Sequence, residues 1–239
     1  ELATTPVNTT AANITAGDVL FRSNTIARAS GAFVGAPALQ LPASPSPLSS
    51  EGQFYVEGNG VFVGDTSASL SIGAGQRGGA DGSLIIESVD SNGIAGNAAV
   101  NVSGGTLTAG SSLEIYADGE AQAATGGNSQ GGTASLTITG GSVNAPVVVV
   151  EANGIADTGT NGIGGNGRGG NASITVSGAG STLVASNIFI NALGSGDSNF
   201  TNGPPAVNGS GTGGTASLTV SNGGSVGPAA LLSLDARGL

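Results

Sequence analysis

The sequence predicts an all-β protein that folds as a right-handed parallel β-helix, a solenoid with three short strands in each coil of about 22 residues. Three observations predict this fold: a strand motif recurs five times, glycine is frequent where the chain must turn, and no segment has the apolar spacing of a helix. Glycine accounts for 45 of the 239 residues. With 38% hydrophobic and only 8% charged residues, the chain can still form a core.

The first element of each repeat is a strand that begins with a small residue and then alternates polar and apolar side chains. Such alternation, rich in β-branched residues, is typical of a strand with one buried face. The five segments begin at Ala68, Ala98, Ala134, Ala172 and Ala216, at intervals of 30, 36, 38 and 44 residues. We expect equivalent strands to stack, which gives inward columns of like side chains. One such column is Leu70, Val100, Leu136, Ile174 and Leu218.

The second and third elements of each repeat are also short apolar strands. The second is centred on Leu107, Val143, Leu183 and Val226, and the third covers 84–87, 113–116, 147–151, 188–191 and 232–235. A glycine closes each repeat 20 to 25 residues after its first residue. Because this length is nearly constant, the variation in period falls in the loops that follow. These loops are rich in Gly, Asn, Ser and Thr, and we expect them to leave the coil at one corner.

The chain divides into an irregular N-terminal β region, residues 1–64, and the β-helix repeats, residues 65–239. Residues 14–23 resemble residues 107–116, which predicts half of another coil near 14–30. Four prolines between residues 31 and 50 predict a long loop there, because proline cannot donate to a strand ladder. Residues 53–63 are expected to form one more coil or a capping hairpin.

Two other architectures fit the sequence less well. A β-propeller has a similar repeat length, but its blades need four strands and usually aromatic anchors. The repeats here contain three strands, and only 3% of the residues are aromatic. Disorder would suit the Gly-rich loops, but it does not explain the alternating strands.

The composition excludes several classes of function. The chain has no His, Cys or Lys, so it lacks the usual general base and the thiolate nucleophile. Asp118 and Glu120 are close enough in sequence for paired carboxylate chemistry, but they fall at a coil corner, and we expect no enzyme. A net charge of −10 argues against nucleic acid as a partner, and no apolar run is long enough for membrane insertion.

No cofactor is expected, with calcium as the one ion considered. The segment 78–84 has glycines and Asp81 in an arrangement similar to a glycine-rich calcium repeat, and Asp81 and Asp90 are the candidate ligands. Glu87 and Glu151 also follow third strands. Two coils would separate them by about 9–10 Å, too far for one ion to bridge.

Two outward faces are of interest for binding. On the third strand, Ile85, Val149 and Phe189 are large, apolar and outward, so they form either an interaction surface or a patch that neighbouring loops cover. On the first strand the outward column is rich in Thr. Such a column is similar to an ice-binding surface, and it is also typical of ordinary solvated strands. This column is Ser71, Asn101, Thr137, Thr175 and Thr219.

The repeat style resembles a known group of proteins. Residues 131–142 (GGTASLTITGGS) and 107–119 (LTAGSSLEIYADG) resemble repeats of giant exported bacterial β-helix proteins, the filamentous-haemagglutinin-like and autotransporter-passenger-like adhesins. The resemblance covers about residues 66–239. It implies export, a long rod at the cell surface or in the extracellular matrix, and a role in adhesion or filament formation.

We therefore expect a non-enzymatic structural protein, a segment of a secreted bacterial adhesin or surface fibre. The last coil runs to Leu239 without a polar cap, which favours a longer chain or end-to-end stacking of copies. The expected partner is another copy, end to end or laterally, or a carbohydrate on a host or environmental surface. The alternatives are a carbohydrate-binding or polysaccharide-active β-helix module and an ice-binding β-solenoid.

Overall fold

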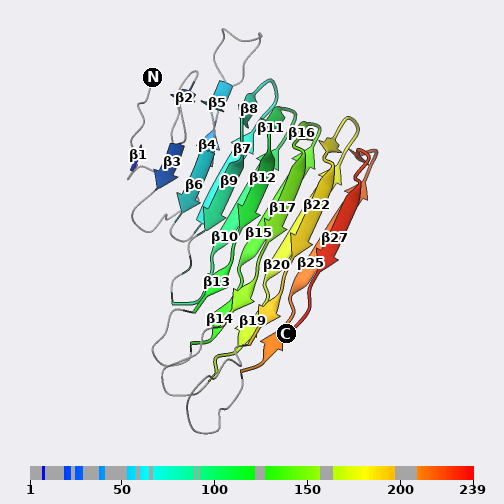
Figure 1. Cartoon of the computed structure of the whole chain (residues 1–239). Helices are drawn as coiled ribbons and strands as arrows, with labels where there is room; N and C mark the ends of the chain where they lie inside the picture. The colour runs from blue at the N-terminus through cyan, green and yellow to red at the C-terminus, as the bar shows by residue number, and fades with distance from the viewer. Residues whose placement is uncertain are drawn as a thin grey trace.

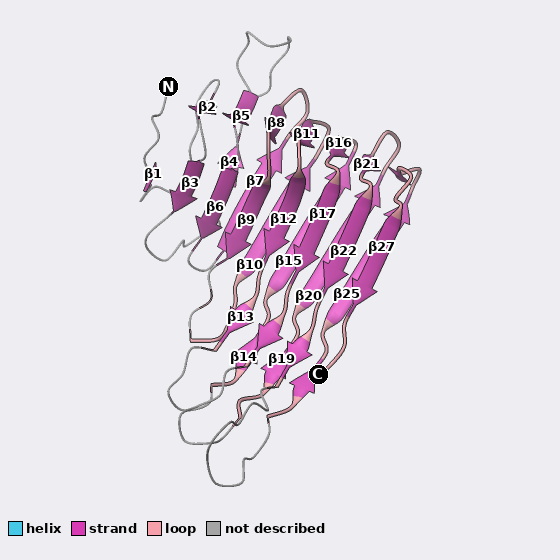
Figure 2. Ribbon diagram, viewed as in Figure 1, coloured by secondary structure: helices cyan, strands magenta, loops and turns pink. Residues whose placement is uncertain are grey.

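The computed structural model describes residues 7–8, 19–22, 25–28, 38–40, 53–57, 60–64, 67–88, 90, 92–121, 127–156, 164–196 and 209–239, with side chains described from residue 67 onward. These residues form strands and loops without a helix (Figure 2). The strands stack along one axis from the N-terminal to the C-terminal end of the chain (Figure 1). Every strand pairing in the described part of the chain is parallel, so the protein is a parallel β-helix.

Three long sheets form the sides of the coil, and each repeat contributes one strand to each sheet. The first sheet contains β4 (Ala38–Gln40), β7 (Ser67–Ile72), β10 (Asn97–Val102), β15 (Thr133–Thr139), β20 (Asn171–Ser177) and β25 (Thr215–Ser221). The second contains β2 (Val19–Arg22), β5 (Gln53–Glu57), β8 (Arg77–Ala80), β11 (Thr106–Ala109), β16 (Ser142–Asn144), β21 (Thr182–Val184) and β26 (Ser225–Val226). The third contains β1 (Val7–Asn8), β3 (Thr25–Arg28), β6 (Gly60–Gly64), β9 (Leu84–Ser88), β12 (Ser112–Tyr116), β17 (Val147–Glu151), β22 (Asn187–Asn191) and β27 (Leu231–Asp235).

The register confirms the alignment of the repeats. Ala98 pairs with Ala68 on one side and with Ala134 on the other, and Ala172 pairs with Ala216. Inward residues therefore form continuous columns along the axis. Their side chains make one hydrophobic core in which most of the interior residues are fully buried. Burial of apolar surface along these columns stabilises the coils against one another.

Two short ladders of three strands each, which the repeat pattern did not predict, lie beyond the third sheet. One contains β13 (Gly119–Glu120), β18 (Gly154–Ile155) and β23 (Gly194–Ser195), and the other contains β14 (Ser129–Gln130), β19 (Gly167–Arg168) and β24 (Gly211–Thr212). The loops that vary in length lie between these two ladders. Their middle parts, residues 122–126, 157–163 and 197–208, lie outside the described residues.

Glycine is required where successive coils approach most closely. A Cβ atom on Gly170 would lie 2.0 Å from the carbonyl oxygen of Gly132, and one on Gly214 would lie 2.0 Å from that of Gly170. These glycines precede the first-sheet strands of their coils. No residue with a side chain fits there without moving the backbone of the neighbouring coil.

The strands before residue 65 lie in the same three sheets as the later repeats. β5 pairs in parallel with β2 and β8, and β6 pairs in parallel with β3 and β9, so residues 53–64 form a coil and not a hairpin. β4 lies within residues 31–50, where a loop was expected, and pairs with β7. The described residues contain no helix long and apolar enough to cross a membrane.

Candidate functional site

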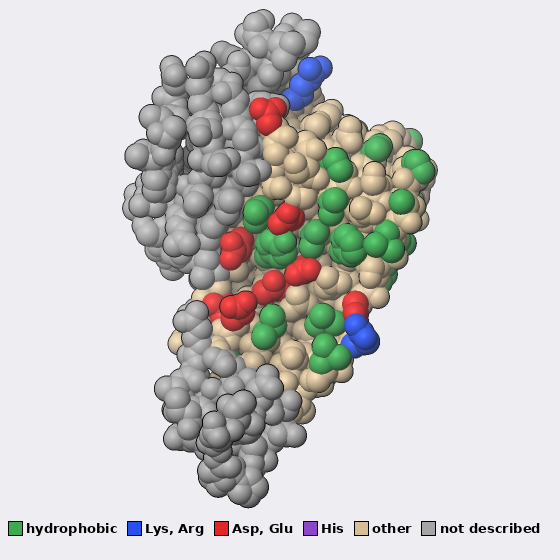
Figure 3. All heavy atoms as spheres, in the orientation of Figure 1, with side chains coloured by type: hydrophobic (Ala, Val, Ile, Leu, Met, Phe, Trp, Pro, Cys, Tyr) green, Lys and Arg blue, Asp and Glu red, His purple; other side chains and the backbone are tan. Residues whose placement is uncertain are grey.

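The outer face of the third sheet carries a strip of apolar side chains. The sheet alternates strictly, so Leu113, Val148 and Ile188 point inward while their neighbours point outward. We define the apolar strip by five outward residues on four strands: Ile85, Val147, Val149, Phe189 and Leu231. The first four are partly exposed and Leu231 is 47% exposed. Figure 3 shows hydrophobic side chains gathered on this face.

A row of carboxylates borders the apolar strip. We define the acidic row by five residues on three successive coils: Glu87, Glu114, Asp118, Glu120 and Glu151. Glu87 and Glu151 both pair with Tyr116, so they belong to one column and stand two coils apart. Acidic side chains lie beside the hydrophobic ones in Figure 3. The face therefore combines apolar contact area with negative charge.

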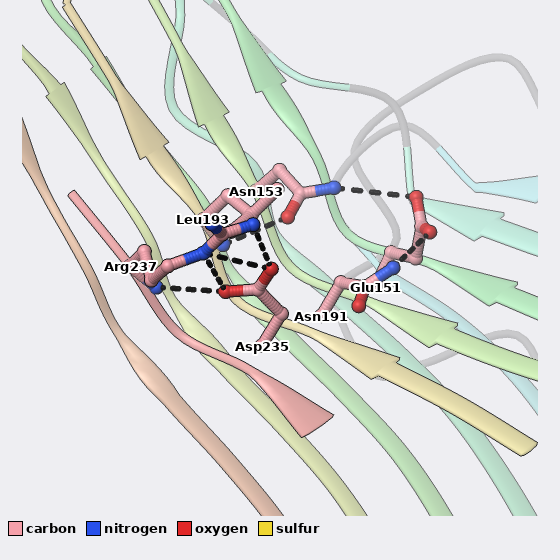
Figure 4. A network of polar contacts seen from close by, with 6 residues as sticks. All are labelled: Glu151, Asn153, Asn191, Leu193, Asp235 and Arg237. Atoms are coloured by element: carbon pink, nitrogen blue, oxygen red, sulfur yellow. Dashed lines mark hydrogen bonds and ion pairs between the residues drawn. The ribbon is translucent and has the colours of Figure 1, made fainter. Parts of the chain in front are cut away.

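Amide side chains hold the carboxylate of Glu151 in place (Figure 4). Asn191 donates to Glu151 Oε1 at 2.7 Å, and Asn153 donates to Glu151 Oε2 at 3.2 Å. The Asn153 amide oxygen in turn accepts the backbone N–H of Leu193 at 2.8 Å. The contacts of Asn191 with Glu151 and of Leu193 with Asn153 join neighbouring coils, so the network also stabilises the stack.

Glu114 is held by two hydroxyl groups. Ser112 Oγ donates to Glu114 Oε1 at 2.5 Å, and Tyr116 Oη donates to Glu114 Oε2 at 2.8 Å. Burial, and then the hydrogen bond to Glu114, raise the pKa of Tyr116, so it stays a neutral donor. Ser112 also contacts Ser83 Oγ at 2.7 Å, which continues the polar chain into the preceding coil.

The carboxyl of Asp118 has a raised pKa. Burial is the largest cause and raises the pKa of Asp118 to about 7, although the backbone N–H of Asn153, at 2.6 Å, stabilises the carboxylate and opposes the rise. The nearby charges of Glu151, Glu120 and Glu87 raise this pKa further. The sequence placed Asp118 at a coil corner, and the desolvated environment of its carboxyl was missed. The available signal was the register, which aligns Asp118 with Asn153 of the next coil.

None of the three arginines with described side chains, Arg77, Arg168 and Arg237, forms an ion pair with the acidic row. Arg237 pairs instead with Asp235, at 2.5 Å, and its guanidinium lowers the pKa of that carboxyl (Figure 4). Arg77 begins a strand of the second sheet, and Arg168 lies in the short β19 ladder. The negative charge of the row is thus left without a cation from the described residues.

A pocket of about 350 Å³ lies where the strip and the row meet. Ile85 supplies an apolar wall, while Glu87, Asp118 and Glu120 supply carboxylates. Ser88 also lines it and is 2% exposed, and its hydroxyl finds no hydrogen-bond partner among the described residues. The pocket is open to solvent and has room for a side chain.

The structure places the residues singled out by sequence as follows. Ile85, Val149 and Phe189 share one outward column, in which Glu114 separates Ile85 from Val149 while Val149 and Phe189 are direct neighbours. Asp81 precedes β9 and Asp90 follows it, so the two lie beyond opposite ends of a five-residue strand about 16 Å long, and one ion cannot use both. Within the described residues no three acidic side chains are grouped closely enough to hold a metal ion.

A different chemistry covers the outer face of the first sheet. From β7 to β25 its outward positions carry only Ser, Thr, Asn and Ala, without a charged side chain on these strands. The column expected from sequence is present in register: Ser71, Asn101, Thr137, Thr175 and Thr219. This face is uncharged and rich in hydroxyls, except on β10, whose outward residues are Asn97, Ala99 and Asn101.

The fold and these faces define a parallel β-helix repeat protein with one amphipathic, acidic side and one hydroxyl-bearing side. No protein-family model, no curated protein and no solved structure matches the chain.

Proposed function

We propose that this chain is a non-enzymatic structural segment of an exported bacterial adhesin or surface fibre. The observation that carries the proposal is the unbroken in-register stacking of coils, which builds a rod whose length grows with each repeat. A rod of this kind holds binding surfaces away from the cell. The resemblance of residues 107–119 and 131–142 to exported β-helix adhesins supports the same role.

Self-association is part of this proposal. In the last coil, Leu232 and Leu234 are 48% and 46% exposed, whereas Ile188 and Ile190, their counterparts one coil earlier, are fully buried. Another coil stacked on β25, β26 and β27 would bury these side chains and pair the open strand edges. The added coil would come from the same chain or from a second copy.

The experiment that tests the proposal is surface labelling of the source organism. An antibody raised against the purified chain should label intact cells or extracellular fibres, seen by electron microscopy. Labelling that requires lysis would overturn the proposed location. Release of reducing sugar from polysaccharides by the purified chain would overturn the non-enzymatic assignment.

Ice binding is a second candidate, because the outer face of the first sheet is uncharged and rich in Ser and Thr hydroxyls on β15, β20 and β25. Strand spacing and strand rise set this array at about 4.8 Å by about 6.7 Å. The chain would then inhibit ice recrystallisation, and Thr175→Glu at the centre of the array would abolish the effect. Absence of inhibition by the unmodified chain removes this candidate.

A further inference from the structure

The outer face of the third sheet pairs exposed apolar groups with negative charge that the described residues do not neutralise. Phe189 and Val149 are adjacent in the apolar strip, and Glu151 lies two residues from Val149 on the same strand and the same face. A partner that covers Val149 therefore reaches the Glu151 carboxylate as well. The two features form one surface.

The charge of this face indicates the chemistry of its partner. A second copy would bring the same carboxylates against one another, in a chain whose net charge is −10. A neutral sugar could stack on Phe189, but it carries no positive charge and would leave the acidic row unneutralised. A partner with lysine or arginine side chains beside aliphatic ones satisfies both the strip and the row.

We propose that the outer face of the third sheet binds a cationic amphipathic segment of another protein. Its apolar side chains lie on the strip, and its lysines or arginines lie on the acidic row. A basic side chain enters the pocket of about 350 Å³ between Ile85, Glu87 and Asp118. This goes beyond the proposed structural role and does not depend on it, because binding is measured on the purified chain whatever its location in the cell.

The first experiment measures the affinity of the whole chain for three synthetic peptides. The probe is an amphipathic helix of leucine and lysine, and its controls replace lysine by glutamate or leucine by serine. We expect binding of the leucine–lysine helix alone, weakened about tenfold from about 0.02 M to about 0.5 M NaCl as the charges are screened. No binding, equal binding of the glutamate peptide, or salt-independent binding would each overturn the proposal.

The second experiment locates the site with matched carboxylate substitutions. Glu87→Gln should weaken binding of the leucine–lysine helix about threefold, and Glu87→Gln with Glu151→Gln about tenfold. Asp81→Asn removes one carboxylate at the opposite end of β9 and should leave the affinity unchanged. Circular dichroism and thermal unfolding establish that each variant folds. An equal effect of Asp81→Asn and Glu87→Gln would mean net charge alone drives binding and would refute the site.

The third experiment separates the proposed partner from a second copy. Phe189→Ser should weaken the leucine–lysine helix about tenfold and leave the remaining binding sensitive to salt. If the strip instead pairs with another copy, the unmodified chain will dimerise in sedimentation velocity. That dimer would strengthen with salt and disappear in Phe189→Ser, and this outcome contradicts the proposal.

Discussion

At the scale of single residues, polar side chains at the coil corners accept hydrogen bonds from backbone N–H groups of the next coil. Within the strands, backbone carbonyl groups accept these bonds. Asp118 accepts the N–H of Asn153, and the Asn153 amide oxygen accepts the N–H of Leu193. A second series runs along the other short ladder, where Asn128 accepts from Asn166 and Asn166 accepts from Ser210, each at 2.9 Å. These side chains satisfy backbone donors at the corners of the coils, and the first series does so where the donors are partly buried.

Because Asp118 belongs to the first of these series, the stability of the folded chain depends on pH. Its pKa is about 7 in the folded chain and about 3.9 in the unfolded chain, so the folded state binds the proton more tightly. The stability from this proton is complete below about pH 4 and is lost as the pH rises through about 7. Ionised Asp118 therefore opposes folding at higher pH.

Asp118→Asn should remove this dependence, because asparagine keeps the acceptor for the Asn153 N–H without a charge. Relative to the parent, the variant should gain free energy of unfolding between about pH 4 and 7 and keep the gain at pH 8. Thermal unfolding at several pH values measures the difference. A difference that does not change with pH would show that Asp118 does not titrate in this range.

At the scale of elements, the corner glycines decide how closely the coils stack. Gly170 and Gly180 lie on either side of β20 and differ in their surroundings. A Cβ on Gly170 would meet the Gly132 carbonyl oxygen, whereas a Cβ on Gly180 would meet nothing within 4 Å. Gly180 has φ of +82°, so its requirement is conformational and not steric.

Gly170→Ala should accordingly cost more than Gly180→Ala. We expect Gly170→Ala to reduce the free energy of unfolding by about 3 kcal/mol, because the coil must move away from its neighbour. Gly180→Ala should cost about 1 kcal/mol from the left-handed backbone. Denaturant unfolding of both variants checks the order, and equal costs would contradict a steric requirement at Gly170.

The strands and their register could be predicted from sequence, whereas the short ladders could not. Alternation with a period of two identifies a strand such as Ala172–Val176 locally, and repetition aligns it with Ala134–Ile138. β19 contains only Gly167 and Arg168, so it has no alternation to recognise. Such two-residue strands form because the adjoining coils already hold them side by side.

At the scale of the whole molecule, each coil is stabilised by contact with its neighbours along the axis. Ile190 has a coil on both sides and is fully buried, while Leu234 in the last coil is 46% exposed. The same type of side chain in the same column therefore contributes differently according to its place in the stack.

Truncation of these two side chains should measure that difference. Ile190→Ala should reduce the free energy of unfolding by about 4 kcal/mol, within the range for buried aliphatic residues, and Leu234→Ala by about 1 kcal/mol, because its removal opens no enclosed cavity. Chemical denaturation with circular dichroism gives both values. Similar losses would indicate that the end coil is covered in solution, as in a stacked assembly.

The sequence by itself determined the all-β fold, the coil repeat, the inward columns and the outward positions of Ile85, Val149 and Phe189. These follow from local alternation and from the repetition of one pattern, which the chain carries in its order of residues. Only the tertiary structure decided that Asp118 is partly buried near Glu87, Glu120 and Glu151, and that the arginines with described side chains form no ion pair with this row. Burial and electrostatic surroundings depend on residues of other coils, brought together by stacking, and no local pattern records them.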